Sequence, residues 1–389
     1  MVSPVRDLRR YRPGRRRAHL LLAVWAAVWF VLMARHGGVS WHFFAEGGDA
    51  FLEAGQPSGG LHVYAYHPQL QMGPLAFYTA AVLLAAGPVY GLLAAQLTMA
   101  AVGLLVFTQA CRVGDEVRPD RAETDAGRRL LLAGAAFIPV WMNLAVRFVH
   151  VDDVLALLFV TLAAQALLHR QTMLTAVLVG LSVDAKPWAL PFVALLLALP
   201  AGTRRRPLLV AGATVLTGWL PFLLADPRTV TAASFTITNS ADSTLRVLGV
   251  VAPVTPWWDR PAQAVLGLAL AAVAVRRGRW GAVVLLATGA RVVLDPGTYT
   301  YYAAGLVVGA LLWDQIGTRR ALPVWTWTAA GSVFASEWLP VPPQVHGLLR
   351  LIFFLLCVWF LVVHPGTGGA APGIGPRHGL LRAGRRAIG

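Results

Sequence analysis

Acidic, basic and histidine side chains gather in a few short segments of this otherwise apolar chain. Asp49 follows the first apolar run, a mixed segment extends from Arg147 to Asp153, and Lys186 precedes a proline. Charged groups at the edge of a hydrocarbon layer are costly, so by default they are functional candidates that need partners. Lys186 stands out because it is the only lysine among 33 basic residues.

Asp49 could act as a general base. It ends the run Glu46-Gly47-Gly48-Asp49 in a long loop. Partial burial raises the pKa of a carboxylate and makes it a better base near neutral pH. The alternative for Asp49 is an ordinary solvated loop acid.

His150, Asp152 and Asp153 stand together at the start of an apolar helix, with Arg147 just before them. Two carboxylates and a histidine could ligate a divalent cation, for which Asp152 and Asp153 are the candidate ligands, or bind sugar hydroxyls. Aspartate is also favoured as a helix N-cap for purely structural reasons. We expect one of the two aspartates to have that structural role.

Lys186 could bind a phosphate, since an ammonium is a compact point charge. Its alternatives are an ion pair with Asp184 or a lysine that snorkels to the interface. Further along, Asp295 is followed by Tyr301 and Tyr302. Tyrosines at this position are typical of an aromatic belt, and they could also line a sugar pocket.

The elements that must position these residues are membrane helices. Hydrophobic residues make up 57% of the chain and charged residues 13%, and a span needs roughly 20 apolar residues. The expected spans are 18–34, 89–111, 130–148, 153–169, 173–185, 187–201, 207–225, 262–275, 280–294, 298–314, 321–338 and 348–364.

Arginine placement sets the orientation. If 73–88 is a re-entrant or juxtamembrane helix rather than a span, 25 of the 33 basic residues fall on one side, which the positive-inside rule makes cytoplasmic. The sequence thus predicts an all-α polytopic protein of the plasma membrane with about 12 spans, cytoplasmic termini and its candidate residues on the outer face. No recognition motif accompanies the basic charge, so nucleic acid is not an expected partner.

The expected organisation has four parts. A basic cytoplasmic N-terminus (1–17) precedes an N-terminal transmembrane module (18–200) that holds most candidate residues. A C-terminal transmembrane module (201–364) and a disordered basic tail (365–389) complete the chain.

In their order along the chain, these segments resemble the C-type membrane glycosyltransferases, the GT-C superfamily, and most closely the bacterial enzymes that use polyprenyl-phosphate mannose. The resemblance rests on Asp49 in the first outer loop, on Tyr66-His67-Pro68, on His150 to Asp153, and on Gly180-Leu181 followed by Lys186-Pro187. It covers residues 18–200. Paired prolines of many relatives are replaced here by Pro68-Gln69, and a second acid beside Asp49 is missing.

The resemblance implies transfer of a mannose-like sugar from a polyprenyl-phosphate donor to a hydroxyl of a lipid or cell-envelope glycan. Asp49 would be the base of an inverting attack, with Asp152 and Asp153 as further catalytic residues. The donor phosphate and substrate would be held by side chains of the outer loops, namely Arg147, His150, Lys186, His67, Tyr66, Asp295, Tyr301 and Tyr302. No nucleotide cofactor is expected because no phosphate-binding loop is present, whereas a divalent metal stays open.

Two other classes remain as alternatives. A transporter or lipid flippase would carry ionisable residues near the middle of its spans, but here the acids cluster at the outer edge. A catalytically inactive membrane scaffold is the third class, and the missing second acid beside Asp49 keeps it open.

Overall fold

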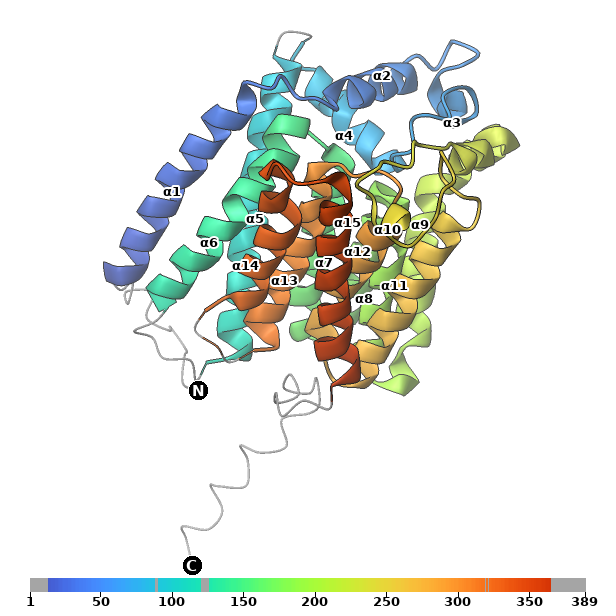
Figure 1. Cartoon of the computed structure of the whole chain (residues 1–389). Helices are drawn as coiled ribbons and strands as arrows, with labels where there is room; N and C mark the ends of the chain where they lie inside the picture. Colours follow the sequence, from blue (N-terminus) through green and yellow to red (C-terminus); the bar gives the residue numbers. More distant parts are fainter. Residues whose placement is uncertain (1–12, 88–89, 120–125, 319, 321, 365–389) are drawn as a thin grey trace, which may run out of the picture.

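The computed structural model describes residues 13–87, 90–119, 126–318, 320 and 322–364, and most of them lie in helices (Figure 1). Within these residues the only β-type pairing is an isolated bridge between Thr238 and Val254. Helices satisfy every backbone N–H and C=O internally, as a hydrocarbon environment demands. The expected tail at 365–389 and most of the expected basic N-terminus lie outside the described residues.

The N-terminal half follows the expected spans closely. Its helices are α1 (Pro13–Ala34), α2 (Trp41–Leu52), α3 (Val63–Tyr66), α4 (Pro74–Leu84), α5 (Gly91–Val117), α6 (Ala126–Met142), a π-helical turn (Asn143–Phe148), α7 (Val151–Leu168), α8 (Thr172–Ala185) and a 3-10 helix (Pro187–Ala198).

The C-terminal half is more broken. Its main helices are α9 (Arg205–Ala225), α10 (Thr244–Val247), α11 (Asp259–Arg276), α12 (Val283–Leu294), α13 (Ala303–Ile316), α14 (Val324–Ala329) and α15 (Pro343–Val358). Short 3-10 or π segments lie at Gly60–His62, Ala201–Thr203, Pro227–Ser234, Trp280–Ala282, Thr300–Tyr302, Ala330–Phe334, Ala335–Trp338 and Trp359–Val363.

Six of the helical segments are long and apolar enough to cross a membrane: 14–34, 91–117, 126–148, 151–168, 205–225 and 343–363. Four shorter apolar helices accompany them, at 74–84, 172–185, 187–198 and 280–294. Helix covers most of the described part of each expected span, which confirms the all-α class, and the long apolar segments agree with a membrane protein. The number of twelve crossings stays a prediction.

The first loop forms a layer across one end of the bundle, where α2, α3 and α4 lie (Figure 1). The helix α4 has 11 residues, which makes it about 16 Å long, too short to cross about 30 Å of hydrocarbon. Gly47 and Gly48 allow α2 to pack closely on α4, because a Cβ at Gly47 would lie 2.4 Å from the ring of Phe77. This geometry agrees with a juxtamembrane helix at 73–88.

A tight turn and a long-range hydrogen bond bring distant segments to the same end of the bundle as this layer. The three residues His169 to Gln171 join α7 to α8, so the two helices form an antiparallel hairpin. The start of α7 therefore lies beside Lys186, where α8 ends and the next helix begins with Pro187. The last turn of α12 reaches the same region, since Arg291 bonds to Asp153.

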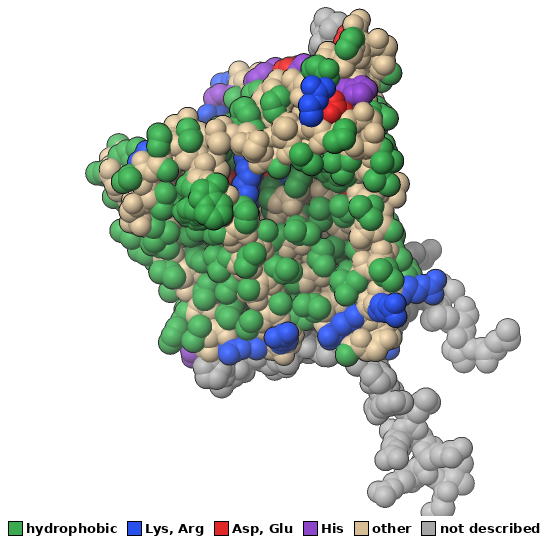
Figure 2. Space-filling model, turned by 90° about the vertical axis from the view of Figure 1, so that its right-hand side faces the viewer, with side chains coloured by type: hydrophobic (Ala, Val, Ile, Leu, Met, Phe, Trp, Pro, Cys, Tyr) green, Lys and Arg blue, Asp and Glu red, His purple; other side chains and the backbone are tan. Residues whose placement is uncertain are grey.

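Charge is segregated along the bundle axis. Figure 2 shows Lys and Arg side chains along one end of the molecule, whereas most of the His, Asp and Glu side chains visible in that view lie at the other end. This distribution is the one expected if the basic end faces the cytoplasm.

Candidate functional site

The site is built on an irregular turn between α6 and α7. Residues Asn143–Phe148 form a π-helical turn, and Val149 follows with φ 52°. A β-branched residue in the left-handed region is strained, and π-helical turns occur often at functional sites. The start of the first loop fixes this turn, because the backbone N–H groups of Val39 and Ser40 donate to the carbonyls of Arg147 and Phe148 at 2.8 and 2.9 Å. The strained backbone at Val149 is thus held in place by neighbouring segments, and it positions His150 at the start of α7.

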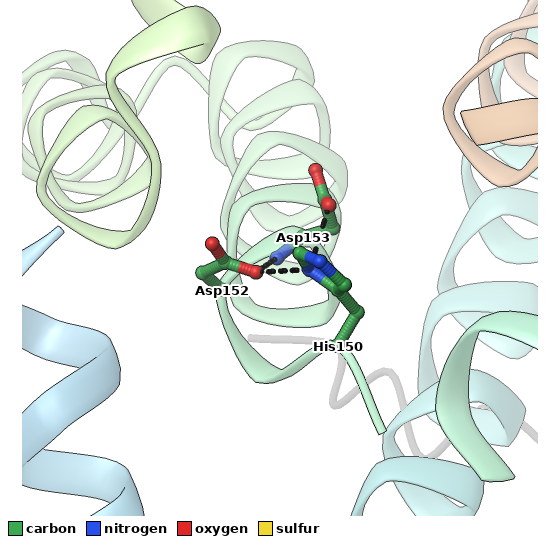
Figure 3. A group of neighbouring side chains, drawn as sticks. All are labelled: His150, Asp152 and Asp153. Carbon is green, nitrogen blue, oxygen red and sulfur yellow. Dashed lines mark hydrogen bonds and ion pairs between the residues drawn. The ribbon is translucent and has the colours of Figure 1, made fainter. Parts of the chain in front are cut away.

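His150 and the two aspartates form a buried group at the start of α7 (Figure 3). The Nδ1 atom of His150 lies 2.5 Å from Oδ1 of Asp152 and 3.0 Å from Oδ2 of Asp153. Because two acceptors face Nδ1, this nitrogen carries a proton. Burial alone would lower the pKa of His150, but the two carboxylates outweigh it and raise the pKa above its usual value.

Asp152 also binds Lys186, whose Nζ donates to its Oδ2 atom. Asp152 is completely buried, whereas 15% of the Lys186 side chain is exposed. Lys186 therefore does not pair with Asp184, one of its expected alternatives. His150 occupies the N-cap position of α7, so neither aspartate is the N-cap residue. Asp152 nevertheless accepts the backbone N–H of Asp153 in the first turn at 2.7 Å, in addition to its bond from Lys186.

Asp153 connects the N-terminal segment to the C-terminal half. Its Oδ1 atom accepts hydrogen bonds from Trp188 Nε1 at 2.7 Å and from Arg291 Nη1 at 3.1 Å. The Arg291 guanidinium lies against the rings of Trp188 and Tyr302, at 4.5 and 4.1 Å from their centroids. These contacts fix the position of Arg291.

Aromatic and acidic groups complete the surroundings of the cluster. Tyr301 stacks on the His150 ring with centroids 4.1 Å apart, and Phe44 of α2 meets the same ring edge-on at 5.4 Å. Asp295 lies with its Oδ2 atom 3.7 Å from Arg291 Nε. The expected residues Asp295, Tyr301 and Tyr302 thus join His150, Asp152, Asp153 and Lys186.

Arg147 belongs to a second, adjoining contact. Its Nη1 atom donates to Asn143 Oδ1 at 3.4 Å, and Asn143 donates in turn to Thr300 Oγ1 at 3.1 Å. The Nε atom of Arg147 is buried and has no hydrogen-bond partner within the described chain. Arg147 therefore retains an N–H that an additional acceptor could satisfy.

A divalent cation does not fit this arrangement well. One ligand atom from each of His150, Asp152 and Asp153 lies within 4.8 Å of the other two. However, the Lys186 ammonium and the Arg291 guanidinium already contact the two carboxylates, and the Nδ1–H of His150 points at them. A metal ion would have to displace these cations or face their charge, so we assign it no role.

Three expected residues lie outside the cluster. Asp49 is on the exposed face of α2, about 140° around the helix from Phe44. His67 Nδ1 lies 3.6 Å from Glu46 Oε1. The ring of Tyr66 lies 4.8 Å from the guanidinium of Arg228. Within the described residues, no hydrogen bond or ion pair joins the Asp49 side chain to the cluster.

Sequence reasoning assigned no role to Arg291 or Trp188, although both stand within the candidate segments around Asp295 and Lys186. The available signal was a single guanidinium within the apolar stretch 283–294, and an indole two residues after the only lysine. Their partner, Asp153, is 138 and 35 positions away.

Comparisons of this chain with known protein families, with curated proteins and with solved structures found no match. The chemistry must therefore be argued from the cluster itself. Lys186 and Arg291 hold several N–H donors at fixed positions, and only some of these donors reach Asp152 and Asp153. Such a pair of partly buried cations can bind an oxyanion and stabilise charge that develops on it.

Proposed function

We propose that this protein is a membrane glycosyltransferase that takes a mannose-like sugar from a polyprenyl-phosphate donor. The observation that carries the proposal is the buried cluster in which Lys186 and Arg291 are fixed by Asp152 and Asp153 at the end of the bundle nearest the first loop. A donor with a phosphate at the membrane boundary and a polyprenyl tail in the bilayer suits that position. Ion pairs preorganise both cations, and the rings of Trp188 and Tyr302 further fix Arg291, as transition-state stabilisation requires.

In the proposed reaction, an acceptor hydroxyl on a lipid or cell-envelope glycan attacks the anomeric carbon of the sugar. The bond between that carbon and the phosphate oxygen breaks, and polyprenyl phosphate leaves with the bonding electrons. Lys186 and Arg291 stabilise the additional negative charge on the phosphate, and the free Nε–H of Arg147 is a further donor for it. A single direct attack inverts the anomeric configuration.

Asp49 is the proposed base for the acceptor hydroxyl. Asp152 and Asp153 are poor bases because each carboxylate is paired with a cation, Lys186 for Asp152 and Arg291 for Asp153, which favours the charged form over proton uptake. The exposed Asp49 carboxylate has no such partner within the described residues, and it lies on the layer that an acceptor would meet first. In this proposal Asp152 and Asp153 position the cations, and the reaction takes place on the outer face of the plasma membrane.

The test is sugar transfer by purified protein in nanodiscs. Radiolabelled polyprenyl-phosphate mannose is supplied with a cell-envelope acceptor extract, and wild type is compared with Asp49→Asn. Because Asp49 is exposed, the variant should fold normally while transfer falls by two to four orders of magnitude, the usual contribution of a general base. Equal transfer by both proteins would remove Asp49 from its role. Absence of donor binding across several polyprenyl-phosphate sugars would contradict the proposal itself.

A further inference from the structure

A cavity of about 770 Å³ opens at the opposite end of the bundle from the charged cluster. The turn between α7 and α8 and the segment that leads into α9 form its walls. The helix α7 has 18 residues, so the cluster and the cavity are separated by about 27 Å, close to the thickness of the hydrocarbon layer. If the cluster is at one membrane boundary, the cavity is at the other.

The lining of this cavity combines cationic and apolar side chains. Arg170, Arg205 and Arg206 contribute guanidinium groups, and among the described residues no Asp or Glu lines the cavity. Leu199 and Leu209 are among the apolar residues of the wall. A ligand with an anionic head and a hydrocarbon chain matches both parts, as basic pockets at the cytoplasmic boundary of membrane proteins match lipid head groups.

The backbone around the cavity is arranged to present these arginines. Arg170 has φ 59°, a left-handed conformation that glycine adopts far more easily at the end of a helix. Its neighbour His169 binds Glu116, with 2.7 Å between Nε2 and Oε2. The Glu116 carboxylate is therefore already paired with a histidine.

On the other wall, Arg204 caps the preceding helix by donating from Nε to the carbonyl of Leu199 at 2.7 Å. The next two residues, Arg205 and Arg206, are exposed and have no hydrogen bond or ion pair to any described residue. Two cations without internal partners border an apolar wall, which leaves them available to an external anion.

We propose that this cavity binds the phosphate head group of an anionic phospholipid, with one acyl chain along Leu199 and Leu209. The phosphate accepts hydrogen bonds from Arg205 and Arg206, and Arg170 contributes a further positive charge. The site is separate from the proposed sugar transfer and does not depend on it.

The test is equilibrium binding of radiolabelled dioctanoyl phosphatidylglycerol to the full chain in a mild non-ionic detergent. Arg205→Gln/Arg206→Gln removes two cations from the cavity. The matched control, Arg128→Gln/Arg276→Gln, removes two exposed cations that do not line it. We expect saturable binding of one lipid, at least tenfold weaker in the first variant and unchanged in the control. Equal weakening in both variants, or equal binding of dioctanoyl phosphatidylcholine, would overturn the proposal.

Two further arms distinguish a lipid from a free phosphate. Leu209→Gln should weaken binding of the lipid, because it places an amide on the apolar wall. Inorganic phosphate should displace the labelled lipid only at concentrations far above those at which unlabelled lipid does. If inorganic phosphate competes as well as the lipid and Leu209→Gln has no effect, the site binds free phosphate and the lipid assignment is wrong.

Discussion

Lys186→Met is the sharpest test of the cluster, because it removes one partner from a buried ion pair. Asp152 is completely buried, and 15% of the Lys186 side chain is exposed. Removal of one partner of a buried pair costs roughly 3–5 kcal/mol of unfolding free energy, since the other charge remains uncompensated. Asp152 keeps His150 Nδ1 at 2.5 Å and the backbone N–H of Asp153 at 2.7 Å. We therefore expect the lower end, about 3 kcal/mol.

The double variant Asp152→Asn/Lys186→Met separates this charge effect from lost packing. It removes both charges, so its unfolding free energy should lie within about 1 kcal/mol of wild type. Because Lys186→Met alone costs about 3 kcal/mol, the coupling energy between the two positions should be at least about 2 kcal/mol, increased by whatever Asp152→Asn costs alone.

The assay is reversible unfolding in mixed micelles of non-ionic detergent and sodium dodecyl sulfate, followed by the fluorescence of the 14 tryptophans. Arg15→Gln serves as control, because Arg15 pairs with Asp115 at 3.0 Å and both side chains are about half exposed. Its cost should be about 0–1 kcal/mol. If the effects of Asp152→Asn and Lys186→Met on the unfolding free energy add, with a coupling energy below about 0.5 kcal/mol, the two residues do not form the buried ion pair argued here.

Three other predictions test separate features. The Oδ1 atom of Asp184 is buried without a hydrogen-bond partner, so Asp184→Asn should leave the thermal midpoint unchanged or raise it; a clear decrease would reveal a bond that this structure lacks. Gly103→Ala should lower the unfolding free energy in the micelle assay by about 1–3 kcal/mol, because the new Cβ would lie 1.9 Å from Trp141 Nε1. Gly212→Ala is the control, since nothing lies within 4 Å of its Cβ, and it should raise the unfolding free energy by about 0.5–1 kcal/mol. Equal effects of the two substitutions would contradict the packing argument. The raised pKa of His150 adds stability that is complete below the unfolded pKa of about 6.5 and is lost as the pH rises through the folded pKa; thermal midpoints from pH 5.5 to 9 should fall over that range in wild type but not in His150→Gln, and parallel curves would remove His150 as the cause.

Much of the fold could be predicted from the chain because hydropathy and helix coincide in a membrane protein. The expected span 153–169 corresponds to α7, and the doubtful segment 73–88 contains the short helix α4. The prediction that 73–88 does not cross the membrane rested on the placement of the basic residues. The length of α4 agrees with that prediction. The 3-10 helix at 187–198 and the π-helical turn at 143–148 were not predicted, because local bends of this kind depend on packing.

The site was predictable only where its members are close in the sequence. His150, Asp152 and Asp153 lie within one turn of α7, and the structure brings them together. The pairing of Lys186 with Asp152 instead of Asp184 depends on the hairpin of α7 and α8, which fixes what lies beside the end of α8. Arg291 was missed because its contact with Asp153 arises from packing between the two halves of the chain.

The most direct measurement of the central claim is the rate of sugar transfer by Asp152→Asn/Lys186→Met beside wild type, in nanodiscs with radiolabelled polyprenyl-phosphate mannose. The double variant is expected to be nearly as stable as wild type, so a loss of transfer cannot be attributed to unfolding. We expect at least a hundredfold lower rate, because the Lys186 ammonium no longer stabilises charge on the leaving phosphate. Transfer at the wild-type rate by the folded double variant would contradict the account.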